Sequence, residues 1–115
     1  MYLDHDKLDV YRTAIEFNTL VSLVIKELPK GSAYFADQLL RASASIALNI
    51  AEGGGEFAKN EKIRFYRMAR RSASECAAIL DILQNLKFIE QSNQLKSREL
   101  LIRIVSMLTK MVIHT

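Results

Sequence analysis

The sequence predicts an all-α protein that folds as an antiparallel up-and-down four-helix bundle. Three observations predict it: apolar residues recur at helical spacings of three and four, two glycine- or proline-containing segments and one loss of periodicity separate four such stretches, and no stretch alternates as strands do. Four helices with short connections pack most simply as an up-and-down bundle. A chain of 115 residues, half of them apolar, suits one domain with its own core, here residues 1–115.

The first predicted helix ends at the break Leu28-Pro29-Lys30-Gly31-Ser32, because proline disfavours helical backbone at the preceding residue. Its apolar seam suits packing inside a bundle and consists of Val10, Ala14, Phe17, Val21, Val24 and Leu28. A second apolar set lies beside the seam, so this helix is either unusually well enclosed or contacts another subunit. We therefore expect an oligomer interface at Leu8, Tyr11, Ile15 and Ile25.

Similar signals bound the other helices. Gly53-Gly54-Gly55 ends the second helix and lets the chain reverse, and Asn60 is the expected N-cap of the third. Helical periodicity is lost from Phe88 to Asn93, before the fourth helix. The expected buried face of the third helix is Phe65, Ala69, Ala73, Cys76, Leu80 and Leu83, and that of the fourth is Leu100, Leu101, Ile104, Leu108 and Met111.

One face of the second helix is unexpectedly polar. At about 100° per residue, four of its side chains fall within roughly 80° of one another. They are Arg41, Ser45, Asn49 and Glu52. Such a stripe either remains in water or meets a second polar stripe. We expect Asn49 and Glu52 to hydrogen-bond with groups at Ser72 or Glu75 on the third helix, or across a subunit boundary, and solvent exposure is the alternative.

The third helix holds most of the local positive charge, since residues 58–71 carry six positive charges and one negative, whereas the whole chain is only +3. The cations are Lys59, Lys62, Arg64, Arg67, Arg70 and Arg71. Guanidinium groups suit phosphate oxygens, and Tyr66 offers a ring that could stack on a base. These residues predict nucleic-acid binding that depends on the charge of the phosphate backbone and not on base sequence. The alternative is a solvated face, or one paired with Glu75 and with acids of the first helix.

Motifs for catalysis and cofactor binding are missing from the sequence. No glutamate is followed three residues later by histidine, as di-metal bundles require, and His5 and His114 stand near the two ends. Cys76 falls on an apolar face, which indicates a structural residue rather than a nucleophile. The triple glycine lacks the phosphate-loop pattern and a preceding strand. We expect no metal, no cofactor and no enzymatic activity.

Cysteine use and hydropathy predict the location. A single cysteine allows no internal disulfide, which fits a reducing compartment. The charged segment 1–12 lacks the apolar core of a secretory signal, and no apolar run approaches the length of a membrane span. We therefore expect a cytoplasmic protein without a membrane partner.

Two stretches carry a resemblance to a known family: QLLRASASIALNIAEGGG, and FYRMARRSASE after a short gap. They resemble the four-helix-bundle proteins encoded within intervening sequences of bacterial 23S ribosomal RNA genes, which carry Ser-Ile-x-x-Asn-Ile-Ala-Glu-Gly and then Ala-x-Gly-Ser-x-x-Glu. The matching residues here are Ser45, Ile46, Asn49, Ile50, Ala51, Glu52 and Gly53, followed by Ala69, Ser72 and Glu75. The opening LDVYR and the Leu28-Pro29 break are also similar, so the resemblance covers nearly the whole chain.

The resemblance implies a homo-oligomer, in the form of a pentameric ring or barrel. It also implies nucleic acid and a reverse transcriptase as candidate partners, because an accessory protein of diversity-generating retroelements is similar. Together with the basic third helix, this favours a non-catalytic oligomer that binds RNA or DNA phosphates, and a protein interaction scaffold without a nucleic-acid role is the alternative.

Two residues depart from the family pattern: Arg71 stands where glycine is usual, and Cys76 where leucine is common. Glycine at a helix contact lets two backbones approach closely. Arg71 therefore either opens a gap between helices or adds charge to an exposed rim.

Overall fold

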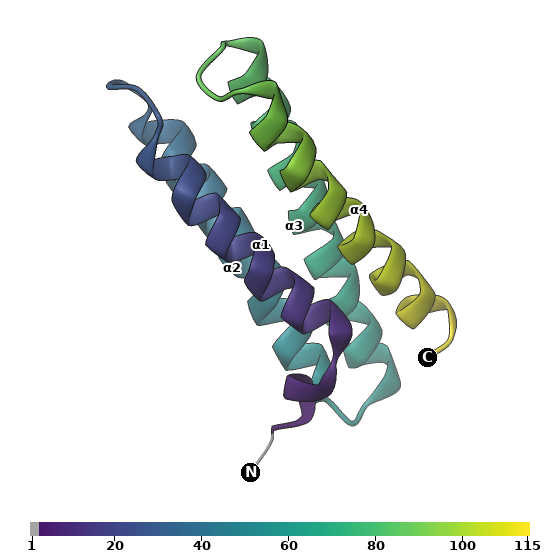
Figure 1. The fold of residues 1–115 in the computed structure, drawn as a ribbon. Helices are drawn as coiled ribbons and strands as arrows, with labels where there is room; N and C mark the ends of the chain where they lie inside the picture. Colours follow the sequence, from purple (N-terminus) through teal and green to yellow (C-terminus); the bar gives the residue numbers. More distant parts are fainter. Residues whose placement is uncertain (1–2) are drawn as a thin grey trace.

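The computed structural model describes residues 3–115 and contains four long helices (Figure 1). A 3-10 turn, η1 (Asp4–Lys7), precedes α1 (Asp9–Lys26), α2 (Ala33–Gly54), α3 (Lys59–Asn85) and α4 (Gln91–Ile113). Consecutive helices run in opposite directions, and α4 packs on α1 as well as on α3. The backbones of α1 and α3 are not neighbours within residues 3–115, nor are those of α2 and α4, so each of these pairs lies diagonally across the bundle. The predicted four-helix bundle is confirmed, and each helix has two neighbours and one outward side.

The core forms where the four apolar faces meet. Every predicted seam residue within α1 is buried, whereas Leu28 lies beyond the end of the helix and is half-buried. The predicted face of α4 is buried at Leu101, Ile104 and Leu108. On α3 the prediction is wrong at one position: Phe65 is only half-buried, and the neighbouring Tyr66 is buried in its place.

The glycines at the end of α2 serve close packing more than chain reversal. The helix ends at Gly54 as predicted, but its C-cap Gly55 has an ordinary φ of −92°, which any residue adopts. Gly53 is buried, and a Cβ atom added to it would lie 2.5 Å from Cε1 of Tyr66. Gly53 therefore leaves the space into which the Tyr66 ring fits. Gly54 similarly faces His5 and Leu8 of the N-terminal segment.

The N-cap of α3 was predicted wrongly. The helix begins at Lys59 with Ala58 as its N-cap residue, two positions before the predicted Asn60. The carboxylate of Glu56 provides the polar contact here, since its Oε1 accepts hydrogen bonds from the backbone N–H groups of Phe57 at 3.0 Å and Ala58 at 3.2 Å. A carboxylate at the start of a helix also interacts favourably with the helix dipole.

The connection from α3 to α4 is a Schellman-type turn within the segment where periodicity is lost. Phe88 N–H donates to the Leu83 carbonyl at 2.9 Å, and Lys87 N–H donates to the Gln84 carbonyl at 2.9 Å. Lys87 occupies the left-handed position, with φ of 62°, which glycine usually fills. None of the helices within residues 3–115 combines the length and apolarity that crossing a bilayer requires.

Candidate nucleic-acid interface

The outward side of α3 carries three arginines. Because Ala69, Ala73 and Cys76 of α3 are buried, helical periodicity places Arg67 and Arg71 within about 30° of the outward direction and Arg70 about 90° to one side of it. All three arginines are exposed, and within residues 3–115 none has an acidic partner at ion-pair distance. Because α3 lies diagonally opposite α1, its side away from the core faces outward from the bundle.

Two of the six predicted cations take part in the fold itself. Lys62 Nζ donates to the carbonyl oxygen of Gly53 at 2.7 Å and ties α3 to the end of α2. Arg64 bonds to the Glu61 carboxylate at 2.9 Å and lies 4.6 Å from the centre of the Phe65 ring. The hydrogen bond and charge of Arg64 lower the pKa of Glu61, and those of Glu61 raise the pKa of Arg64. The most available cations are therefore Lys59, Arg67, Arg70 and Arg71.

Tyr66 cannot stack on a base, contrary to the sequence-based interpretation. Its side chain is only 3% exposed because it packs against Gly53, and this burial raises the pKa of its hydroxyl. Tyr66 lies close to Arg64 and Arg67 in the sequence, as aromatic residues of nucleic-acid stacking sites often do. Its position on the helix nevertheless directs the ring into the core. The core has room for the Tyr66 ring because Gly53 of α2 has no side chain at this position.

The polar stripe of α2 meets α3 through a serine pair. The Ser72 hydroxyl donates to Ser45 Oγ at 2.9 Å, and Asn49 Nδ2 donates to the same oxygen at 3.0 Å and to the Ser45 carbonyl at 2.9 Å. A hydrogen bond between α2 and α3 therefore exists, but Ser45 forms it and not the expected Asn49 or Glu52. Neither Asn49 nor Glu52 hydrogen-bonds to α3 within the described chain, and Arg41 bonds to Asp37 of its own helix at 3.1 Å.

A shallow groove of about 390 Å³ lies beside this serine pair, between α2 and α3. It is lined by Ser45, Asn49, Met68, Arg71, Ser72 and Glu75. Two of these, Ser45 and Asn49, belong to the polar stripe of α2, and Ser72 and Glu75 are the partners expected on α3, whereas Met68 was not anticipated. Arg71 is exposed at this groove, so the residue that departs from the family pattern adds charge to an exposed rim.

The residues predicted to form an oligomer interface on α1 are placed unequally. Leu8, Tyr11 and Ile25 are half-buried and pack against the core of their own chain. The Tyr11 ring also meets that of His5 edge-on, with 4.6 Å between the ring centres. Ile15 is 42% exposed and is the member of this set that most clearly faces outward.

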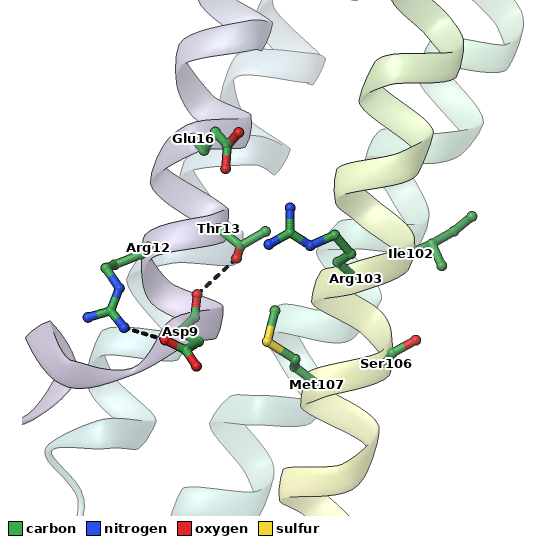
Figure 2. Close-up of a pocket in the computed structure, with 8 residues that line it drawn as sticks. All are labelled: Asp9, Arg12, Thr13, Glu16, Ile102, Arg103, Ser106 and Met107. Atoms are coloured by element: carbon green, nitrogen blue, oxygen red, sulfur yellow. Dashed lines mark hydrogen bonds and ion pairs between the residues drawn. The ribbon is translucent and has the colours of Figure 1, made fainter.

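A second surface feature, which the sequence-based reasoning missed, is the groove between α1 and α4. Two adjoining depressions of about 470 and 480 Å³ follow it and share Glu16 and Arg103. Figure 2 shows Arg103 reaching from α4 toward α1, near Thr13, and Met107 also pointing toward α1. Ile102 points away from α1, on the outer side of α4. The outer side of α4, where Ile102 lies, also carries Leu95 and Ile113, and the spacings of seven and eleven between these three residues are present in the sequence.

The described residues include few groups suited to catalysis. Cys76 is buried, and this burial, with a smaller contribution from the Glu75 charge, raises the pKa of its thiol to about 12. The thiol therefore stays protonated and unreactive at neutral pH. In the part of the chain that the structure describes, no three potential metal ligands lie close together.

Comparison with known families agrees with this architecture. The family model described as 23S rRNA-intervening sequence protein matches residues 6–110. The chain belongs to this family. The polar motif that begins at Ser45 and the serine at position 72, which carry the family resemblance, thus form the contact between α2 and α3 in this 23S rRNA-intervening sequence protein.

Solved structures include a similar fold. A crystal structure of a protein of unknown function from the S23 ribosomal protein family of Bacteroides thetaiotaomicron VPI-5482 matches with a TM-score of 0.83 and 21% sequence identity. The match covers 90% of this chain and 97% of that one. At this identity the similarity shows the fold alone. No curated protein sequence matches the chain significantly.

Proposed function

We propose that this protein is a non-catalytic homo-oligomeric bundle that binds RNA or DNA phosphates through α3. The observation that carries the proposal is the exposed set Arg67, Arg70 and Arg71, for which residues 3–115 provide no acidic partner. The planar donor fork of each guanidinium matches phosphate oxygens in geometry and charge. An anionic strand along α3 would relieve the mutual repulsion of these three cations.

Binding of this kind depends on charge and carries little sequence information. Lys59 extends the basic surface toward the start of α3. Lys62 and Arg64 contribute less, because they already bond to Gly53 and Glu61. The phosphate-binding set is therefore narrower than the six cations of the sequence: it consists of Lys59, Arg67, Arg70 and Arg71.

Self-association is the second part of the proposal. On α4, Leu95, Ile102 and Ile113 are 54%, 59% and 70% exposed. Their spacing places them within about 20° on one line along the helix. On α1, Leu23 lines the groove and is 54% exposed, whereas Ile15 is 42% exposed outside the groove. Apolar side chains gathered in this way favour a protein partner. The α1 side of such a contact lies away from the arginines of α3, because α1 and α3 are diagonally opposite, and the α4 side adjoins α3.

We favour five subunits, the number implied by the family resemblance. Five copies of a chain with net charge +3 carry +15, and five arginine sets would bind one strand cooperatively through multivalency. The same resemblance makes a reverse transcriptase the candidate protein partner. We place the assembly in the cytoplasm, where the single cysteine stays reduced.

A salt titration tests this function. We expect wild-type protein to bind a 20-nucleotide RNA with an affinity that falls steeply with salt, with a slope of log K against log salt near −2 if three phosphates of a single strand are neutralised. Arg67→Glu/Arg70→Glu should weaken binding at least about tenfold while the oligomer mass stays constant, since two phosphate contacts become repulsive.

The matched control is Lys26→Glu/Lys30→Glu, which changes net charge equally but acts at the opposite end of the bundle (Figure 1). Equal weakening by both double variants, or affinity independent of salt, would contradict the proposal. If the arginine variant instead lost its assembly with RNA binding unchanged, α3 would be a protein interface and the scaffold alternative would hold.

A further inference from the structure

The groove between α2 and α3 contains more hydrogen-bonding capacity than the protein uses. Arg71 and Glu75 lie one turn apart on α3, about 6 Å along the helix axis, yet they form no ion pair. In the described chain neither side chain has a hydrogen-bond partner. The groove therefore presents an available cation and an available carboxylate side by side.

The neutral groups of the groove are similarly arranged. Ser45 Oγ accepts two hydrogen bonds, from Ser72 and from Asn49, so its own hydrogen has no acceptor among residues 3–115. Asn49 directs its Nδ2 group to Ser45, which leaves Oδ1 as an acceptor without a partner in the same part of the chain. Ser45 is thereby held by Ser72 of α3, and Asn49 by Ser45 of its own helix. The Ser45 hydroxyl can still donate one hydrogen bond, and Asn49 Oδ1 can still accept.

A phosphate does not suit this groove, because the Glu75 carboxylate would repel it. A nucleobase edge suits it better, since bases present donors and acceptors together. Guanine alone offers two neighbouring acceptors, O6 and N7, to a guanidinium, and two neighbouring donors, N1–H and N2–H, to a carboxylate. Met68 adds a polarizable thioether, which contacts aromatic rings favourably.

The position of the groove agrees with the proposed path of a strand. Arg71 lines the groove and is also one of the three unpaired arginines on the outward side of α3. Arg67 and Arg70 are one turn or less away on the same helix. A strand whose phosphates lie on Arg67 and Arg70 would bring an unstacked base to the groove.

We propose that this groove binds a guanine base of single-stranded RNA or DNA, with Arg71 donating to O6 and N7 and Glu75 accepting from N1–H and N2–H. This inference rests on the proposed function and adds a base preference to it: Lys59, Arg67 and Arg70 keep the phosphate contacts, and Arg71 turns to the base. The preference requires an unpaired base, because N1–H and N2–H are occupied in a duplex.

The test compares three labelled 12-nucleotide RNAs at one salt concentration: oligouridine, the same with three separated guanines, and the same with three separated adenines. We expect the guanine RNA to bind about tenfold more tightly than the adenine RNA, the range of one bidentate base contact. Glu75→Gln should bring this ratio close to one while binding to oligouridine is retained or improved. Thermal melting checks that the variant, altered at an exposed position, stays folded.

Arg67→Gln is the matched control, because it should weaken binding of all three RNAs alike and preserve the guanine preference. Tight oligouridine binding without a guanine preference would overturn the inference and leave the proposed function standing. Binding to none of the RNAs would overturn both. NMR provides a second readout. Guanosine monophosphate should shift the signals of the Asn49 amide and the Arg71 guanidinium, and an acidic peptide should not. The reverse result would assign the groove to a protein partner and overturn the inference.

Discussion

The α2/α3 and α1/α4 contacts lie on opposite sides of the same bundle and are built differently. Between α2 and α3, Gly53 admits the Tyr66 ring, Ser72 bonds to Ser45, and Lys62 bonds to the Gly53 carbonyl. Between α1 and α4, the described residues form no hydrogen bond or ion pair, and two depressions follow the contact. Small residues and cross-helix hydrogen bonds bring one pair of helices close together, whereas longer polar side chains leave a groove between the other pair.

This difference separates two roles within one fold. The α2/α3 contact contains the family motif and fixes the position of the α3 arginines. The α1/α4 contact contributes less to the packing of the protomer and leaves apolar residues of both helices exposed. Changes on the first side should therefore alter the stability of the protomer, and changes on the second should alter its association.

The largest effect is expected at Gly53. Gly53→Val should lower the free energy of unfolding by about 3 kcal/mol, because its Cβ would overlap the buried Tyr66 ring and overpacking costs this much in a tight core. Urea denaturation measures the change. Gly55→Ala is the matched control: the added Cβ would lie 3.7 Å from the Ala51 carbonyl, an ordinary contact, so stability should stay constant or rise slightly. Similar losses in both variants would contradict the close-packing role of Gly53.

A smaller loss is expected at Ser72. Ser72→Ala removes the hydrogen bond to Ser45 across the helix contact and should lower the free energy of unfolding by about 1 kcal/mol. Ser74→Ala, which removes only an exposed hydrogen bond to the Arg70 carbonyl of the same helix, should have little effect. The same denaturation experiment compares the two. Indistinguishable curves would mean that the serine pair does not strengthen the α2/α3 contact.

The smallest effect on the protomer is expected at Ile102. Ile102→Asn on the outward side of α4 should change the free energy of unfolding by less than about 0.5 kcal/mol, as exposed substitutions usually do. Light scattering should nevertheless show a lower mass in solution than that of the wild-type protein. Leu48→Asn, at a similarly exposed position on α2, should leave the mass constant. An unchanged mass for Ile102→Asn would remove α4 from the proposed interface.

The helices and most of the core were predictable because their signals are local. The spacing of apolar residues identified the buried faces of α1, α3 and α4, glycine or proline marked the first two breaks between helices, and a loss of periodicity marked the third. The choice between Phe65 and Tyr66 was not predictable in this way. Both residues border the apolar face, and the one that is buried depends on the space left by Gly53, a residue on another helix.

The candidate site divides in the same manner. Sequence alone placed Arg64, Arg67 and Arg71 on the face of α3 away from the core, since helical periodicity fixes which side of the helix they occupy. Only the tertiary structure decided that Lys62 is committed to the end of α2, that Ser45 joins the two polar helices, and that Arg71 and Glu75 border one groove. The physical reason is that periodicity determines the direction of a side chain on its own helix, whereas its partners depend on how neighbouring helices approach.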